Sequence, residues 1–210
     1  MFARHLMTVG LACAAASAAT ASYTITQGST PTTYSGYTLN FDEPGTPTGI
    51  VADTTWQMSH GVTIGAGDGI PFVDDNDALQ GGWGLGDGNS FFGNFGVFMT
   101  FDYDVTEMAF EMWDTSGTPS PFGGGAAIFL FDDGVQVDSL FNITPAFGGI
   151  GDSWFNVVAD SGMVFDEIRI LGFGTPAFTF VDNLSWNAIP TPGALGLFGI
   201  AGMTAIRRRR

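Results

Sequence analysis

The stretch that decides the fold is AAIFLFDDGVQVDSL, residues Ala126–Leu140. Two short apolar runs flank an Asp-Asp-Gly turn at residues 132–134. An Asp-Gly pair between such runs is typical of a tight hairpin turn, because both residues tolerate a positive φ. The stretch therefore predicts two antiparallel strands joined by a hairpin.

The rest of the chain repeats this pattern of short runs with period 2, separated by Gly, Pro, Asn and Asp, and Tyr23–Ala188 contains no long helical period. The number and spacing of the runs predict an all-β protein, most simply a jelly-roll-like two-sheet sandwich. The expected strands are Thr38–Phe41, Val62–Ile64, Val97–Phe101, Met108–Trp113, Ala126–Phe131, Val135–Leu140, Trp154–Val158, Phe165–Leu171 and Ala177–Trp186. The expected core residues are Phe110, Phe129, Phe131, Ile168, Ile170, Phe178 and Phe180.

The charges are distributed very unevenly along the 210 residues. Lysine is absent, and five of the six basic residues lie at the two ends, so the middle of the chain sets Arg169 against all 21 acidic residues. Its formal charge of −20 disfavours phosphates and anionic headgroups, which excludes nucleic acid as a partner. Such a charge indicates solubility or the binding of divalent cations.

The N-terminus reads as a secretory signal, residues 1–21. A short basic start precedes an apolar run, and Ala19-Thr20-Ala21 fits the small-x-small rule for cleavage before Ser22. A retained anchor and a lipoprotein modified at Cys13 are the alternatives. Cys13 is the sole cysteine, so the mature chain would have no disulfide.

The C-terminus, residues 189–210, has three parts in order. The motif Pro190-Thr191-Pro192 breaks the chain, residues 193–206 are uncharged and apolar, and the chain ends with Arg207, Arg208, Arg209 and Arg210. Terminal arginines stay cytoplasmic by the positive-inside rule. We expect a short membrane helix over residues 193–206 with a basic tail over 207–210.

This arrangement resembles the PEP-CTERM sorting signal of bacterial exported proteins, in its planctomycete-like Pro-Thr-Pro form. The resemblance implies recognition by an exosortase-type membrane protease, transient residence in the inner membrane, and final localisation at the cell surface or in the extracellular matrix. Residues 22–188 would be the ectodomain. They too resemble the jelly-roll ectodomains of such proteins, in the segments NFDE (40–43), FMTFDYDVTEMAF (98–110) and FVDNL (180–184).

Two carboxylates are candidate calcium ligands. Phe178, Phe180, Asp182, Leu184 and Trp186 would share one face at period 2, which places Asp182 in apolar company. Glu43 aligns in the same way near the start of the chain, and pairing of the first and last strands would bring Glu43 and Asp182 together. Oxygen ligands of this kind suit a structural Ca²⁺; the alternatives are that Asp182 caps a turn or that a bulge points it outward.

Catalytic signatures are absent from the sequence. His60 is the only histidine after the expected signal, and we expect it to be a loop residue without a catalytic role. Residues 65–94 are rich in Gly and Asp and are expected to form a long surface loop, on which Trp83 is a candidate ligand platform. We expect a non-enzymatic surface or matrix protein that binds extracellular polysaccharide. The alternatives are a secreted glycan-active enzyme with paired carboxylates and a purely structural envelope protein.

Overall fold

The computed structural model describes residues 22–75, 88–114, 126–143, 153–172 and 178–189. These residues are mostly β-strands, joined by turns and irregular segments, with one short helix. The strands are β1 Tyr23–Gly28, β2 Tyr37–Leu39, β3 Gly49–Ile50, β4 Val62–Ala66, β5 Phe72–Asp74, β6 Ser90–Asn94, β7 Val97–Asp114, β8 Ala126–Asp132, β9 Val135–Ile143, β10 Trp154–Ala159, β11 Phe165–Gly172 and β12 Phe178–Ala188; the helix is α1 Gln57–His60.

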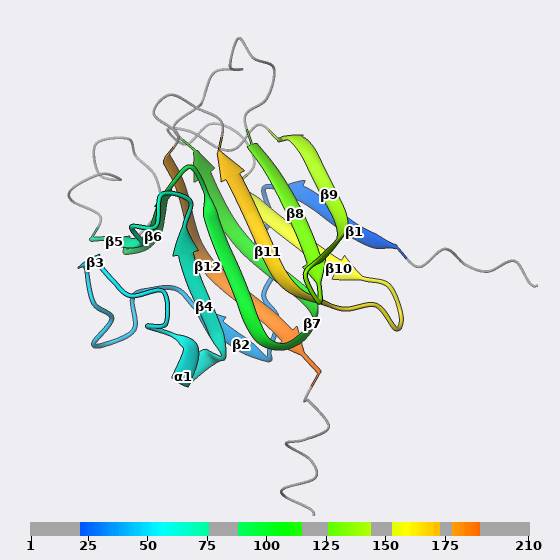
Figure 1. Cartoon of the computed structure of the whole chain (residues 1–210), viewed down its shortest axis with the longest axis horizontal. Helices are drawn as coiled ribbons and strands as arrows, with labels where there is room; N and C mark the ends of the chain where they lie inside the picture. Colours follow the sequence, from blue (N-terminus) through cyan, green and yellow to red (C-terminus); the bar gives the residue numbers. More distant parts are fainter. Residues whose placement is uncertain (1–21, 76–87, 115–125, 144–152, 173–177, 190–210) are drawn as a thin grey trace, which may run out of the picture.

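The long strand β7 belongs to both layers of the molecule (Figure 1). Its first half, Val97–Phe101, pairs with β4 and β11, and the order continues from β11 to β8 and β9. Its second half, from Val105 onward, pairs with β10 and β12. β1 pairs with β10. β2 and β6 both pair with β12, at different parts of its length, and β5 and then β3 follow β6. We call the two groups the front layer and the back layer, as Figure 1 is viewed.

The main core lies between the two layers. Every second side chain of each half of β7 points into it. Val97 and Met99 face inward from the first half, and Met108, Phe110 and Met112 from the second. The largest fully buried side chains of the described residues are Trp186, Phe41, Phe91, Phe110, Phe155, Phe165, Phe180, Leu39, Ile64, Met99 and Met108. Each of the aromatic side chains in this list buries roughly 150–250 Å². Aromatic packing therefore supplies much of the stability.

Each expected strand overlaps a strand of the structure, although β2 ends at Leu39 and leaves Asn40 and Phe41 outside it, and Ala177 lies outside the described residues. The predicted hairpin has Asp133 at φ 49° and Gly134 at φ 75°, and the strands on either side pair in antiparallel register. Two expected strands, Val97–Phe101 and Met108–Trp113, are parts of the single strand β7. The sequence reasoning missed β1, β3, β5 and β6, and the last two lie within the expected surface loop 65–94.

The expected core needs two corrections. Phe129 and Phe131 are half-buried on the outer side of β8, and the inward positions belong to Ile128 and Leu130. The pattern alone could not choose the face, because all four residues are apolar. Phe178 and Phe180 also lie outside the main core, in a small cluster completed by Trp113 and Phe92; Phe110, Ile168 and Ile170 are confirmed.

The expected single face of β12 is also wrong. Asn183 has φ 51°, and the pairing with β7 shifts between Asp182 and Ser185, which indicates a bulge. A bulge inserts one residue and exchanges the two faces beyond it. Leu184 and Trp186 therefore lie in the main core, whereas Phe180 and Asp182, before the bulge, point to the outer side of the back layer.

The antiparallel all-β architecture is thus confirmed for the described residues. The expected signal segment 1–21 lies outside them, and so do residues 190–210 of the expected sorting segment 189–210. Within the described part of the chain, no helix is long and apolar enough to cross a membrane.

Candidate functional site

Trp154 stands at the start of β10, on the outer side of the back layer. It alternates with Phe155, which is buried in the main core, and its partner across the sheet is Glu111 on β7. The Trp154 side chain is only partly buried. Strand alternation therefore presents the indole on the outer surface while the neighbouring ring anchors the strand.

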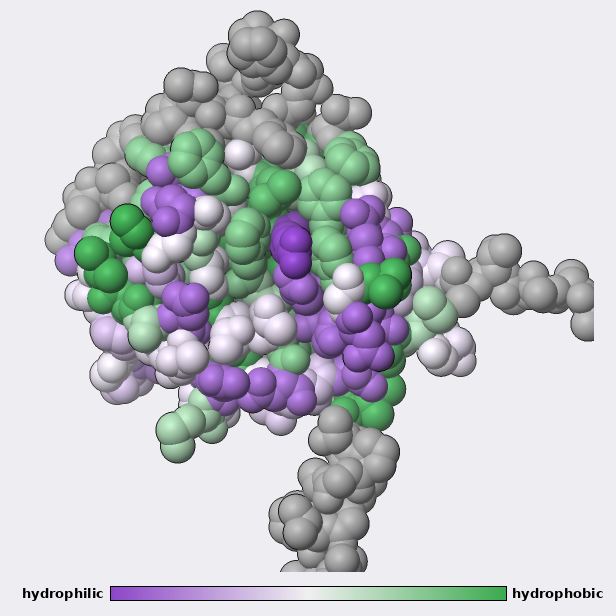
Figure 2. Space-filling model, viewed as in Figure 1, coloured by the Kyte–Doolittle hydropathy of each residue, from purple (hydrophilic) through white to green (hydrophobic). Residues whose placement is uncertain are grey.

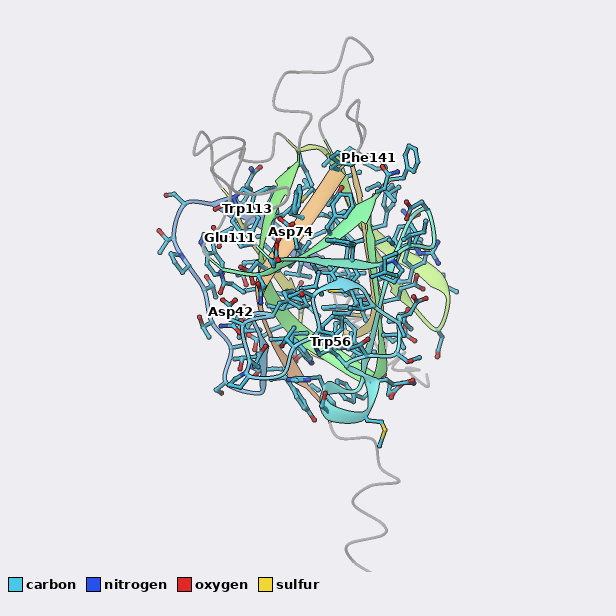
Figure 3. The ribbon with its side chains drawn as sticks, turned by 90° about the vertical axis from the view of Figure 1, so that its left-hand side faces the viewer. Asp42, Trp56, Asp74, Glu111, Trp113 and Phe141 are labelled. Carbon is cyan, nitrogen blue, oxygen red and sulfur yellow. The ribbon has the colours of Figure 1, made fainter. Side chains whose placement is uncertain are left out.

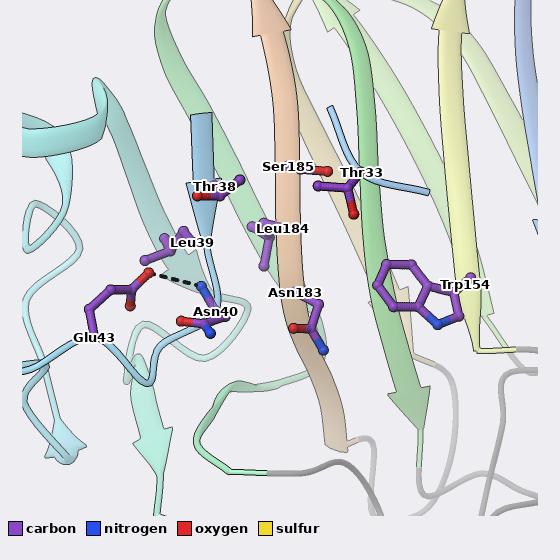
Figure 4. Close-up of a pocket in the computed structure, with 9 residues that line it drawn as sticks. All are labelled: Thr33, Thr38, Leu39, Asn40, Glu43, Trp154, Asn183, Leu184 and Ser185. Atoms are coloured by element: carbon purple, nitrogen blue, oxygen red, sulfur yellow. Dashed lines mark hydrogen bonds between the residues drawn. The ribbon is translucent and has the colours of Figure 1, made fainter. Parts of the chain in front are cut away.

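A cavity of about 360 Å³ opens on one side of Trp154 (Figure 4). It lies between β2, β12 and the start of β10, and the close-up shows Asn183 and Ser185 on β12 between Glu43 and Trp154. Its lining residues are Thr33, Thr38, Leu39, Asn40, Glu43, Trp154, Asn183, Leu184 and Ser185. Of these described residues, Glu43 alone is charged.

A second cavity, of about 330 Å³, opens along β1 and β10 and shares Trp154 with the first. None of the described residues that line it is charged. The lining residues are Thr26, Gln27, Gly28, Ser29, Thr30, Thr32, Trp154, Phe155 and Asn156. We call Trp154 and these two cavities together the tryptophan site.

The segment of residues 29–36 crosses the outer side of the back layer and supplies hydroxyl groups to both cavities. Tyr34 anchors it, because its backbone N–H donates to Ser185 Oγ at 3.0 Å and its hydroxyl donates to Asn156 Oδ1 at 2.6 Å. Burial, together with the charge of Glu107, raises the pKa of the Tyr34 hydroxyl. The hydroxyl therefore remains a protonated donor at neutral pH, and the crossing segment is held against the sheet.

Two carboxylates share one amide beside the tryptophan site. Asn183 Nδ2 donates to Glu111 Oε2 at 3.0 Å and lies 3.5 Å from Asp182 Oδ2, and the Asn183 backbone N–H donates to Asp182 Oδ1 at 2.6 Å. The hydroxyl of Ser153 donates to the other oxygen of Glu111 at 2.7 Å. Figure 3 labels Glu111 and Trp113 on the same side of the molecule. The bulge thus uses the amide of Asn183 to hold two neighbouring carboxylates.

The two predicted calcium ligands are placed differently. Glu43 lines the larger cavity, where its Oε1 accepts from the Asn40 backbone N–H at 3.2 Å and its buried Oε2 has no hydrogen-bond partner among the described residues. Asp182 is 1% exposed and does not line that cavity, although its neighbour Asn183 does. The expected pairing of the two strand ends is confirmed, with Leu39 opposite Leu184. Within the described ranges no group of three or more Asp, Glu, His or Cys residues is arranged to hold a metal ion, so calcium remains a prediction.

The chemistry of the tryptophan site is that of a binding surface. Hydroxyl and amide side chains donate and accept hydrogen bonds on both sides of an aromatic ring, and Glu43 supplies one acceptor. His60 lies elsewhere: its Nδ1 is 2.8 Å from Ser59 Oγ at the end of α1. The sequence reasoning missed Trp154. The available signal was that Asn156 shares its face, whereas Phe155 and Val157 point the other way.

The predicted platform residue Trp83 lies outside the described residues. The residues predicted for signal cleavage and for sorting also fall outside them, except Ser22, whose hydroxyl donates to Asp160 Oδ2 at 2.5 Å.

Comparison with known proteins gives limited similarity. No family model matches the chain, and no curated protein matches it. Among solved structures, the Stig cyclase Fisc from Fischerella sp. TAU, in complex with (3Z)-3-(1-methyl-2-pyrrolidinylidene)-3H-indole, is 14% identical, with a TM-score of 0.42, over 72% of this chain and 95% of that chain. A second cyclase structure from Fischerella sp. TAU is 13% identical, with a TM-score of 0.41 and the same coverage. TmCBM61 in complex with β-1,4-galactotriose is 10% identical, with a TM-score of 0.36, over 68% of this chain and all of that chain. At TM-scores below 0.5, these similarities carry no argument about function.

Proposed function

We propose that the chain is an exported, non-enzymatic protein of the cell surface or extracellular matrix that binds a neutral polysaccharide at the tryptophan site. The observation that carries the proposal is the position of Trp154 between two cavities lined mainly by hydroxyl and amide groups. A pyranose ring has apolar C–H faces and a rim of hydroxyls. An aromatic ring flanked by such groups complements both features.

The charge of the site favours a neutral ligand. Among the described residues, Glu43 is the only ionisable one that lines either cavity, and residues 22–188 carry a formal charge of −20. This negative field would repel an acidic polysaccharide. The open, two-part shape suits a chain of several sugars lying across Trp154.

The proposed localisation rests on the two ends of the chain. We propose cleavage before Ser22, PEP-CTERM-type sorting by an exosortase-like protease, and passage through the inner membrane by the helix at residues 193–206. A jelly-roll ectodomain would then be released to the surface or matrix. Deletion of Arg207–Arg210 is expected to send the protein to the medium or to block its processing. Unchanged localisation and processing would remove the sorting part of the proposal.

The binding experiment compares Trp154→Ala with Phe95→Ala in the purified exported protein. Phe95 is 58% exposed and lines neither cavity, so its loss controls for the removal of a surface ring. The probes are cellohexaose, laminarihexaose and mannohexaose, with hexagalacturonate as the acidic arm. If stacking buries about 60 Å² of ring face at ~25 cal/mol per Å², its loss costs about 1.5 kcal/mol, a rise in Kd of roughly tenfold.

The expected result is saturable binding of a neutral hexasaccharide, weakened in Trp154→Ala and unchanged in Phe95→Ala. Trp154→Phe should retain part of the affinity. Absence of binding to every probe would favour the purely structural alternative, and preference for hexagalacturonate would contradict the proposed ligand class.

A glycan-active enzyme is the second candidate, favoured by the Glu111–Asp182 pair that shares Asn183. Two neighbouring carboxylates are the usual requirement for glycoside hydrolysis. Release of reducing ends from the polysaccharide, abolished in Glu111→Gln, would establish this candidate. The low exposure of Asp182 favours the binding proposal, because a catalytic carboxylate must reach the glycosidic bond.

A further inference from the structure

A cavity of about 410 Å³ lies on the outer side of the front layer, across β4, β7 and β11. It lies away from the tryptophan site, because the first half of β7 forms its floor and the second half carries Glu111, the partner of Trp154. The main core separates the two halves. The lining residues are Asp53, Thr63, Gly65, Ala66, Phe98, Thr100, Glu167 and Arg169; we call this the arginine site.

Strand register explains how the arginine site is assembled. Phe98 on β7 lies between Gly65 on β4 and Arg169 on β11, and in the next row Thr100 lies between Thr63 and Glu167. These positions alternate with core residues, so they point outward. Gly65 leaves room in the first row: a Cβ there would meet only the carboxylate of Asp53, at 3.6 Å and beyond.

Arg169 is held in place before any ligand arrives. Its Nε donates to Glu167 Oε1, and its guanidinium carbon lies 4.2 Å from the centroid of the Phe131 ring and 5.9 Å from that of Phe98. Its side chain is nevertheless 43% exposed. A guanidinium fixed by an ion pair and by stacking loses little freedom on binding. Figure 2 shows hydrophobic side chains gathered over this part of the front layer, with a strongly hydrophilic group among them.

The composition of the site selects a neutral polyhydroxyl ligand. Arg169 offers N–H donors, Asp53 and Glu167 offer acceptors, and Thr63 and Thr100 carry hydroxyls that do both. One arginine against two carboxylates leaves the lining negative, which disfavours an acidic ligand. Neighbouring hydroxyls of a sugar pair well with this mixture, and Phe98 provides an apolar surface for the sugar ring.

We infer that the arginine site is a second, independent binding site for a neutral glycan, so that one molecule bridges two polysaccharide chains. The inference takes its ligand class from the proposed function. The two outer faces then bind glycan separately, and the protein cross-links polysaccharide chains instead of only attaching to one.

The test measures stoichiometry by calorimetry with the neutral hexasaccharide that binds most tightly among the three probes. The variants are Gly65→Leu, which fills the arginine site without changing charge, Arg169→Met, and Trp154→Ala. Val135→Ala is the control, because Val135 is 65% exposed on β9 in the same layer and lies outside the cavity. Two oligosaccharides per chain are expected for the unmodified protein and for Val135→Ala, one for each single-site variant, and none when Gly65→Leu and Trp154→Ala are combined.

Light scattering with the parent polysaccharide tests the bridging. The unmodified protein should form large aggregates at low protein-to-glycan ratios, and each single-site variant should bind without aggregating the polysaccharide. One oligosaccharide per chain that is lost only with Trp154→Ala would overturn this inference and leave the proposed function standing. One that is lost only with Gly65→Leu would move the proposed function to the arginine site and also overturn the bridging.

Discussion

The two outer faces of the molecule differ in the regularity of their strands. On the front face, the register of β11 on β7 shifts between Phe165 and Glu167, but from Glu167 to Ile170 β4, β7, β11 and β8 align residue by residue, and the row that contains Phe98 and Arg169 crosses the sheet without interruption. On the back face, β12 is interrupted at Asn183 and a separate segment crosses the sheet, anchored by Tyr34. On the regular face the hollow lies where Gly65 leaves a gap in a ladder of side chains, whereas on the bulged face the hollows lie beside the crossing segment and the interrupted strand.

The largest predicted effect is the loss of stability when an inward-facing side chain of the front layer is truncated. Leu130→Ala should lower the free energy of unfolding by about 2–5 kcal/mol, as for other fully buried leucines. Phe131→Ala, on the outer side of the same strand, should cost about 1–2 kcal/mol, mainly through its contact with Arg169. Urea unfolding of both variants checks the order. A larger loss for Phe131→Ala would mean that the face assignment of β8 is reversed.

The second prediction is that Ca²⁺ stabilises the protein through carboxylates of the back layer and not of the front layer. Ca²⁺ bound only to the native state at a hundredfold excess over Kd adds about 2.7 kcal/mol to the free energy of unfolding. We predict a higher Tm in Ca²⁺ than in Mg²⁺ at matched ionic strength, because Mg²⁺ requires a tighter geometry. Glu43→Gln and Asp182→Asn should each abolish the difference.

The matched control for calcium is Glu167→Gln, which removes a carboxylate from the front face and should leave the Ca²⁺ effect intact. If the unmodified protein melts at one temperature in both ions, the negative charge serves solubility alone.

The third prediction concerns the bulge. Asn183→Gly keeps the left-handed backbone and loses only the side-chain amide, whereas Asn183→Val also forces a β-branched residue to positive φ. We expect the Val variant to be about 1–3 kcal/mol less stable than the Gly variant, the usual cost of such strain. Thermal unfolding of the pair gives the difference, and equal stabilities would show that the bulge relaxes without cost.

The smallest expected effect is a pH dependence at the front layer. Burial raises the pKa of Asp132, with the charges of Asp133, Asp166 and Asp104 as further causes, and burial also raises the pKa of Asp166. A carboxyl whose pKa is higher in the folded state binds protons more tightly there, so its contribution to stability falls as the pH rises above the unfolded value of about 3.9. Asp132→Asn should therefore stabilise the protein at pH 7 by less than about 1 kcal/mol, since the site is close to solvent. The gain should shrink as the pH falls towards 4, and a gain that grows on acidification would contradict the sign.

The sequence predicted the strands well and their faces less well. The alternation of apolar and polar residues and the turn residues located β8, β9 and the turn between them, because two runs of period 2 separated by Asp-Gly are typical of a β-hairpin. The sequence could not show whether Ile128 and Leu130 or Phe129 and Phe131 face inward. The answer depends on which face of β8 the other layer covers. The bulge at Asn183 had no local signal beyond an Asn, so the sequence could not choose between a core-facing Asp182 and the alternative, a bulge that points it outward, which the structure has. The cavities beside Trp154 depend on a crossing segment 120 or more positions away in the chain, which periodicity does not place.

The central claim, that Trp154 is the principal aromatic contact for glycan on the back face, is tested most directly by fluorine NMR. The chain has five tryptophans, so labelling with 5-fluorotryptophan gives one resonance each, assigned by single Trp→Phe changes. Titration with the neutral hexasaccharide should shift the Trp154 resonance saturably and leave those of the buried Trp56, Trp113 and Trp186 in place. A shift confined to Trp83, or no shift at Trp154 at saturating ligand, would contradict the account.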